Sequence, residues 1–306
     1  MSQSTTATQL KTGHQVRLAC RSNALAAPTT ALAPSYLQAN LVVLPSRHAP
    51  SFRLLCARNP VPCPLIAESA SPGSWSSFRS HVPGVPDGGK LLGDVDIRRD
   101  VPLFNVYVDG VPARANCTDI VSSWTDDHVA FLVGCSFSFE AALAKAGLTP
   151  RHAATGRNVP MYRTTVPLCP AGVFTGGTYV VSMRPYRASE VGRVRDVTRA
   201  YAATHGEPVD WGWDAVARLG IADVGKPEWG DAPLARDGRT ALGSGAVGGS
   251  GDGNDDDDDD DDVPVFWGCG VTPQEAVMRA KLPGVVMAHA PGHMLLLDVQ
   301  DHEVIS

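Results

Sequence analysis

The chain has 306 residues but no apolar run of the roughly 20 residues that a membrane-spanning helix needs. Its polar N-terminus, MSQSTTATQLKTGHQV, lacks the apolar core of a secretory signal peptide and the arginines of a transit peptide. These absences predict a cytoplasmic protein that has no membrane partner.

The cysteines lack the spacing that is typical of a disulfide framework. There are seven, an odd number, spread along the chain without a C-x-x-C pair. A disulfide framework and a zinc ribbon are therefore disfavoured, and no metal site is predicted. We interpret the cysteines as reduced thiols, most of them small buried residues.

Several catalytic motifs are also missing. The sequence has no P-loop, no H-E-x-x-H and no G-x-S-x-G. Nucleotide-dependent chemistry and serine hydrolysis are therefore disfavoured.

Charge is concentrated in one place. The net charge is −6, but Asp255–Asp262 are eight consecutive aspartates, so the rest sums to about +2 (−6 + 8). No basic stripe or aromatic–arginine platform is present, so nucleic acid is not an expected partner. The Gly-, Ser- and Asp-rich stretch 237–262 has too little apolar surface to offset the entropy of ordering. We predict a disordered insertion without a catalytic role; attraction of cations is the alternative.

Two further polar segments divide the chain. Residues 1–13 are predicted to be a disordered tail, and 67–90 a Ser-, Gly- and Pro-rich loop. The segments 14–236 and 263–306 carry strand-like and helix-like patterns and are predicted to form one catalytic unit. The last two apolar runs predict strands joined by a tight turn at Pro291–Gly292.

Two segments repeat one design. Gly134-Cys135-Ser136 and Gly268-Cys269-Gly270 each follow an apolar strand, VAFLV or VPVFW, and each precedes a helix-like pattern. Ser138 and Thr272 stand where N-caps are expected, and Thr272 opens a capping-box pattern. The repeat predicts two strand–turn–helix units of similar geometry.

Such turns present backbone N–H groups at a helix N-terminus. This arrangement binds carboxylate or phosphate and lowers the pKa of a thiol. The alternative is that Gly-Cys is only small enough for a sharp, closely packed turn, and for either turn alone this explanation is favoured. Together the two turns favour a shared pocket for one anionic ligand, in which the backbone of Gly134–Ser136 is a safer candidate than the Cys135 thiol.

Other polar residues complete a candidate site. Arg163 and Arg184 follow or lie within strand-like runs, where arginine suits bidentate carboxylate binding, although a surface ion pair explains either one alone. His289, His293 and Glu140 are candidates for proton transfer, and each histidine alone is equally explained as a hydrogen-bonded core residue. The candidates for orienting a substrate are Asn40, Asn158 and Tyr162.

Several long motifs resemble the bacterial hydro-lyases of the D-glutamate cyclase family. They are PTTALAPSYLQANLVVLP, LCARNPVPCPL, DVDIRRDVP, FLVGCSFSFEAAL, GRNVPMYRT, VVSMRP, GVTPQEAV and HAPGHML, in that order. The first motif departs from the family pattern, because Ala31 and Ser35 replace glycines. The resemblance implies an α/β fold with mixed sheets and flanking helices in two intertwined lobes.

The resemblance also implies a carbon–oxygen hydro-lyase without a cofactor. Family members include an enzyme that interconverts D-glutamate and 5-oxo-D-proline, so the expected partner is a small carboxylate or amino acid. One alternative is a cofactor-independent amino-acid racemase or epimerase that uses Cys135 and Cys269. A second alternative is a non-enzymatic protein that binds an amino acid. A homo-oligomer is compatible with all three.

Overall fold

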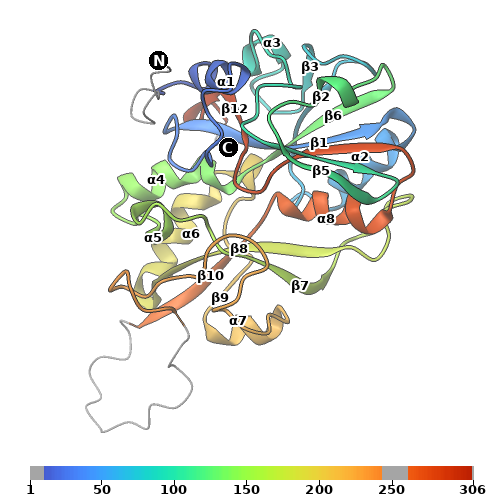
Figure 1. Cartoon of the computed structure of the whole chain (residues 1–306). Coiled ribbons are helices and arrows are strands. Elements are labelled where there is room, and N and C mark those ends of the chain that lie inside the picture. The colour runs from blue at the N-terminus through green and yellow to red at the C-terminus, as the bar shows by residue number, and fades with distance from the viewer. Residues whose placement is uncertain (1–9, 243–260, 305–306) are drawn as a thin grey trace, which may run out of the picture.

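The computed structural model describes residues 10–242 and 261–304, which form two antiparallel β-sheets with helices around and between them (Figure 1). The segments predicted to be disordered, 1–13 and 237–262, lie mostly outside the described residues. Their described ends contradict the prediction, because Thr12 caps a helix that begins at Gly13 and Asp262 begins a strand. Every strand pairing recorded in the described ranges is antiparallel. The predicted α/β class is confirmed.

The first sheet has eight strands in the order β3-β2-β6-β1-β11-β4-β5, with β12 also paired to β1. Its strands are β1 Tyr36–Pro45, β2 Leu65–Ser69, β3 Phe78–Ser80, β4 Phe104–Val108, β5 Val111–Cys117, β6 His128–Gly134, β11 Val285–His289 and β12 Leu295–Gln300.

Strand β1 forms the centre of this sheet. Side chains alternate between the two faces of a strand. Leu41 and Val43 accordingly join the apolar core on one face, and Val42 and Leu44 join the core on the other. Burial on both faces explains the continuous apolar run LVVL.

The second sheet has four strands in the order β7-β8-β10-β9. Its strands are β7 Met161–Pro167, β8 Thr178–Arg187, β9 Asp210–Trp211 and β10 Asp262–Gly268. The apolar side chains of β10 also alternate between two cores, because Val265 and Trp267 face one cluster and Phe266 faces another.

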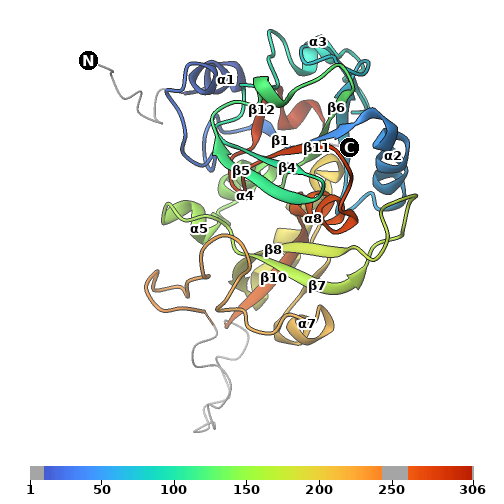
Figure 2. The same ribbon diagram turned by 45° about the vertical axis from the view of Figure 1, so that its right-hand side comes forward.

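The helices cover the sheets and separate them. They are α1 Gly13–Arg21, α2 Ala49–Arg58, α3 Gly88–Leu91, α4 Glu140–Lys145, α5 Arg151–Ala154, α6 Val191–Arg199, α7 Trp213–Arg218 and α8 Val271–Ala280. Short 3₁₀ turns span Ser46–His48, Val121–Ser123, Ser136–Phe139, Ala188–Glu190, Ala202–Thr204 and Asp301–Glu303. Helix α8 lies between the two sheets in both ribbon views (Figures 1 and 2) and contacts β8 and β1.

Each sheet with its helices forms one lobe, and the chain passes between the two lobes twice. It leaves the first sheet after β6, builds the second sheet, and returns from β10 through α8 to β11 and β12. The lobes are therefore intertwined, as the family resemblance implied. The second lobe cannot be removed as a terminal piece, because the last two strands of the first lobe follow it in sequence.

Strands β11 and β12 are joined by the predicted tight turn at Pro291–Gly292, where the N–H of His293 donates to Ala290 O at 3.0 Å, but the two strands lie one after the other along β1 instead of pairing with each other. Both run antiparallel to β1 on the same side, with Val42 opposite Ala288 and Ala39 opposite Leu295. The segment around Pro291–Gly292 therefore bulges out between two strands that pair with the same edge of β1. It leaves a gap in the pairing beside Asn40 and Leu41, on the side opposite β6.

Other local predictions also differ. The segment 67–90 is not wholly a loop, because it holds the end of β2, all of β3 and the start of α3. Neither Ser138 nor Thr272 is an N-cap: the Ser138 hydroxyl bonds to the backbone of Gln38, and the Thr272 hydroxyl to the backbone of Val180. Tertiary partners thus replace the local helix caps.

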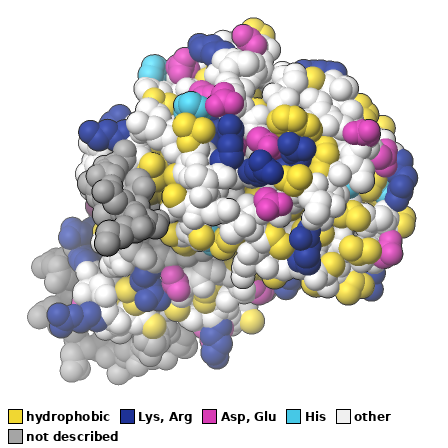
Figure 3. All heavy atoms as spheres, turned by 45° about the horizontal axis from the view of Figure 1, so that its top comes forward, with side chains coloured by type: hydrophobic (Ala, Val, Ile, Leu, Met, Phe, Trp, Pro, Cys, Tyr) yellow, Lys and Arg dark blue, Asp and Glu magenta, His cyan; other side chains and the backbone are white. Residues whose placement is uncertain are grey.

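The surface view in Figure 3 shows acidic and basic side chains close to one another on that face. Helix α1 also makes ion pairs, such as Arg21 with Asp100, whose Nε–Oδ1 distance is 2.7 Å. In the described ranges, no helix combines the length and the apolar character that crossing a membrane requires.

Candidate active site

The two Gly-Cys turns meet at one pocket between the sheets. Cys135 follows β6 of the first sheet, and Cys269 follows β10 of the second. The polar residues lining the pocket are Asn40, Cys135, Ser136, Asn158, Cys269 and His289. The remaining walls are Phe137, Val159, Met161, Gly270, Val271, Gly292 and Met294.

The pocket is nearly closed. Its free space is about 20 Å³, which is close to the volume one water molecule occupies. A ligand as large as an amino acid therefore needs the two lobes, or the bulge around Gly292, to move apart.

Both pocket thiols are protonated near neutral pH. Burial raises the pKa of Cys135 to about 12 and that of Cys269 to about 11. The backbone of Phe137 donates to the first sulfur and that of Val271 to the second, and each of these bonds lowers the pKa by less than burial raises it. The expected lowering of the thiol pKa is therefore wrong, because desolvation of the charged form dominates.

Asn40 explains the glycine at position 270. Its amide nitrogen Nδ2 donates to the carbonyl of Gly134 at 2.8 Å. A Cβ placed on Gly270 would lie 1.8 Å from the same nitrogen. The glycine is needed because the Asn40 side chain occupies the space that any other side chain would enter.

Asn158 presents an unsatisfied polar atom. Its Oδ1 is buried and has no hydrogen-bond partner among the described residues. Its other side-chain atom, Nδ2, would lie 2.9 Å from a Cβ on Gly292, whose φ of +84° also favours glycine. Buried polar atoms are normally paired, so this amide is available to a ligand.

His289 is a neutral imidazole with an assigned orientation. The N–H of Leu41, freed by the gap in strand pairing, donates to Nδ1 at 3.1 Å, and the Gln274 amide lies 2.7 Å from the same nitrogen. Nδ1 also lies 3.3 Å from Leu41 O, but its two shorter contacts are with N–H donors. These favour Nδ1 as the acceptor and the proton of the neutral ring on Nε2. Burial lowers the pKa of His289 to about 4.

Arg184 and Glu140 lie behind the pocket, paired with each other. The Arg184 Nε donates to Glu140 Oε1 at 2.9 Å, and its Nη2 donates to Ser136 Oγ at 3.1 Å. Burial alone would raise the pKa of Glu140, but the charges of His152 and Arg184 lower it below its usual value. Arg184 therefore holds Ser136 in place, and its guanidinium is not free to bind a substrate carboxylate.

Three other predicted residues do not reach the pocket lining. The Tyr162 hydroxyl donates to Val224 O at 2.6 Å in another apolar cluster. The exposed Arg163 pairs with Glu275 at 2.7 Å. His293 lies beside the site, where its Nδ1 is 2.9 Å from Pro291 O. Tyr162 and Arg163 are therefore not placed to orient a substrate in this pocket.

The glycines before the cysteines serve packing. A Cβ on Gly134 would lie 2.0 Å from Ala203 O, and one on Gly268 would lie 3.1 Å from Val61 O. Both positions bring the end of a strand against the backbone of another segment. Their predicted substrate-binding role is not supported by this placement, because neither lines the pocket.

Gln274 was missed by the sequence reasoning. In the capping-box pattern that Thr272 opens, Gln274 was only an intervening residue, whereas in the structure its amide lies 2.7 Å from Nδ1 of His289. The pairing joins residues 15 positions apart on α8 and β11. No local pattern indicated it.

The fold and the site together define a two-lobed α/β protein with a small-molecule pocket between the lobes, lined by two thiols, two amides and an imidazole. The profile of the family described as D-glutamate cyclase matches residues 129–298. A "putative hydro-lyase" of Schizosaccharomyces pombe is 41% identical over 285 residues, covering 93% of this chain and 83% of that protein.

Bacterial relatives are equally similar. A "putative hydro-lyase" of Bordetella petrii is 43% identical over 291 residues, covering 95% of each chain. Another from Bordetella pertussis is 44% identical over 287 residues, covering 94% of this chain and 89% of that protein. The chain belongs to the D-glutamate cyclase family, whose relatives include fungal as well as bacterial proteins.

Proposed function

We propose that the protein is a carbon–oxygen hydro-lyase that interconverts D-glutamate and 5-oxo-D-proline, or acts on a closely related small carboxylate. The observation that carries the proposal is the pocket itself. It gathers proton donors and acceptors from both lobes, and the unpaired Asn158 Oδ1 is available to a ligand. Membership of the family and the names of its relatives support the same reaction class.

Cyclisation of glutamate requires two proton movements. The amine nitrogen attacks the side-chain carboxyl carbon, a C–N bond forms, and a C–O bond then breaks. The ammonium loses two protons, and these leave with one carboxylate oxygen as water. The site must therefore accept a proton from nitrogen and deliver one to the departing oxygen.

His289 fits the delivery step. Its neutral ring carries a proton on Nε2, while Leu41 holds Nδ1. The low pKa keeps the ring neutral at pH 7, so it donates as imidazole or accepts as a weak base. Cys135 and Cys269, which are protonated, are further donors for the oxygen that develops negative charge.

Ser136 and Asn158 fit substrate binding. The Ser136 hydroxyl accepts from Arg184 and is therefore free to donate its own proton to a carboxylate. The Asn158 Oδ1 accepts from an ammonium group. Arg184, whose charge is paired with Glu140, holds the Ser136 hydroxyl in this orientation.

The test is incubation with D-glutamate, 5-oxo-D-proline and their L-isomers in D2O, followed by mass spectrometry and NMR. We expect loss or gain of water with the D-compounds and no deuterium at Cα. His289→Gln and Asn158→Ala should lower turnover at least about 100-fold. Tyr162→Phe and Arg163→Ala, outside the pocket, serve as controls and should retain activity. Full activity of both pocket variants would contradict the proposal.

One observation favours a second candidate. Cys135 and Cys269 line the same pocket, and Cys269 lies close enough to raise the pKa of Cys135. A two-thiol racemase or epimerase removes an α-proton with one cysteine and returns a proton with the other. This reaction requires deuterium at Cα, whereas the hydro-lyase does not incorporate it there. Stabilisation by an amino acid without turnover or exchange would instead indicate a binding protein.

A further inference from the structure

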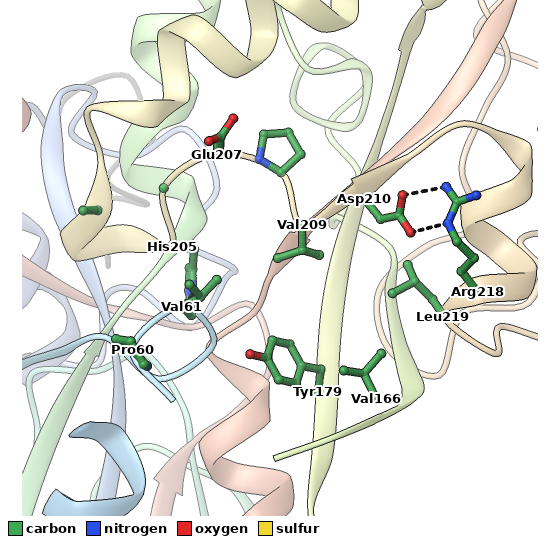
Figure 4. Close-up of a pocket in the computed structure, with 13 residues that line it drawn as sticks. Pro60, Val61, Val166, Tyr179, His205, Glu207, Val209, Asp210, Arg218 and Leu219 are labelled. Carbon is green, nitrogen blue, oxygen red and sulfur yellow. Dashed lines mark hydrogen bonds and ion pairs between the residues drawn. The ribbon is translucent and has the colours of Figure 1, made fainter. Parts of the chain in front are cut away.

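A second cavity of about 640 Å³ lies behind the Gly-Cys turns, on the other side of residues 203–205 from the closed pocket. Figure 4 shows its walls, which come from the turn before β2, from β7 and β8, and from the segment leading into β9. Most of the lining side chains are apolar. They include Pro60, Val61, Val166, Tyr179, Val209 and Leu219.

The charged side chains at this cavity are already paired. Asp210 binds Arg218 with N–O distances of 2.7 and 3.0 Å, and Glu207 binds Arg195 at 3.1 Å. A ligand with a net charge would have to compete with these pairs or be desolvated without compensation. The cavity is therefore suited to an uncharged molecule.

Tyr179 supplies a polar contact inside the apolar walls. Its side chain is half-buried, and its hydroxyl points into the cavity (Figure 4). In the part of the chain that the structure describes, this hydroxyl has no recorded hydrogen-bond partner. A ligand with one hydroxyl or N–H group can use the phenol as donor or acceptor.

His205 connects this cavity to the first Gly-Cys turn. It is buried in the cavity wall with a φ of +89°, and its Nδ1 lies 2.8 Å from Val61 O. Its Nε2 faces the backbone of Gly134 without a well-aligned hydrogen bond. The preceding residues Ala203 and Thr204 lie directly against Gly134.

We propose that this cavity binds a small uncharged molecule with an apolar body and a single hydroxyl or N–H group, and that the segment 203–205 transmits its presence to the Gly134–Cys135 turn. The apolar body matches the apolar walls, and the polar group matches Tyr179. This site is separate from the proposed catalytic pocket, so its ligand is not the substrate.

The first experiment measures binding of phenol and of toluene, which differ by the hydroxyl group, to the full-length protein by NMR titration. We expect saturable binding of phenol with a dissociation constant on the order of 1 mM. Tyr179→Phe should weaken phenol about fivefold and leave toluene unchanged, because a single hydrogen bond is lost.

A narrowed cavity provides the second variant. Val209→Trp should weaken binding of both probes at least about threefold, because the larger side chain takes up part of the cavity. Val111→Trp, at an exposed position on β5 in the other lobe, should not affect it. Absence of saturable phenol binding to the wild type, or an unchanged affinity in Val209→Trp, would overturn the proposed site.

Hydrogen exchange tests the connection. Phenol should slow amide exchange in the peptide that contains Gly134 and Cys135 at least about twofold, because a filled cavity restrains residues 203–205. At the same phenol concentration the change should be smaller in Val209→Trp than in Val111→Trp. Binding without any change at this peptide would overturn the transmission to the turn.

Discussion

The two Gly-Cys turns begin alike and then diverge. In each, the sulfur accepts a hydrogen bond from the backbone two residues later, and burial raises its pKa. After Cys135 the chain forms a 3₁₀ turn before α4, whereas after Cys269 it enters α8 almost directly. The third position is Ser136 in one turn and Gly270 in the other.

The difference at the third position shows a division of roles. Ser136 has a hydroxyl that Arg184 holds in place, so the first turn contributes a polar group. Gly270 has no room for a side chain because the Asn40 amide lies against it, so the second turn contributes space. A repeated sequence design therefore produces an asymmetric pocket, as a reaction on an asymmetric substrate requires.

The largest expected effect concerns the thiols that the turns share. With pKa values of about 12 and about 11, Cys135 and Cys269 should be alkylated by iodoacetamide at pH 8 roughly 1000-fold and 100-fold more slowly than a free thiol of pKa 8.5. Mass spectrometry of the labelled peptides measures the rates, with the exposed Cys169 as the internal control. Labelling of Cys135 as fast as Cys169 would show that the pKa of Cys135 is not raised as that of Cys269 is.

The next prediction concerns the buried ion pair between Arg184 and Glu140 behind the first turn. Arg184→Met leaves the buried Glu140 without its arginine partner and should lower the free energy of unfolding by about 3 kcal/mol. Arg163→Met removes an arginine from an exposed pair and should cost less than about 1 kcal/mol. Urea denaturation compares the two variants, and equal losses would show that the buried pair has no special importance.

A smaller effect comes from the buried histidines. Burial lowers the pKa of both His205 and His289 to about 4, so the unfolded chain binds more protons than the folded one between about pH 6.5 and pH 4. Stability is therefore retained above pH 6.5 and falls with pH in this interval, by about 2 kcal/mol per histidine between pH 7 and pH 5.

Replacement of one histidine tests this dependence of stability on pH. His205→Gln should reduce the loss of unfolding free energy between pH 7 and pH 5, measured in urea at both pH values. His302→Gln, at an exposed position, is the matched control and should leave the loss unchanged. An identical pH dependence in the wild type and in both variants would exclude His205 as a source.

The smallest effect tests the second turn. Gly270→Ala should destabilise the protein by about 1 kcal/mol, because the Asn40 side chain must move aside. Gly192→Ala, in α6 with no atom near the added Cβ, should instead stabilise it by roughly 0.5 kcal/mol. Combining Gly270→Ala with Asn40→Ala should remove the steric part of the penalty, and thermal unfolding measures all three.

Much of the fold followed from local pattern. The apolar runs VAFLV and VPVFW, each followed by a Gly-Cys turn and a helix-like pattern, predicted the strands β6 and β10 and the helix α8. The resemblance between the two turns also predicted a common pocket, and the structure places both cysteines on one. The repeated sequence pattern therefore indicated which segments form the pocket before any contact was known.

The site could be predicted only in part. Asn40, Asn158 and His289 line the pocket, but Arg163 and Tyr162 lie elsewhere, because a strand alternates its faces and the sequence does not say which face meets the other lobe. The thiol pKa values were predicted in the wrong direction. A local pattern reports the helix N-terminus that lowers a pKa, but burial depends on the whole fold.

The sequence alone determined the α/β class, the two strand–turn–helix units and the family. Tertiary structure decided what those units do. The continuation of β11 into β12 along β1 opens a gap at Leu41, whose N–H then fixes the His289 ring. The return of the chain through α8 sets Gly270 against Asn40. Both contacts join residues more than 200 positions apart, and no local pattern encodes a contact at such a separation.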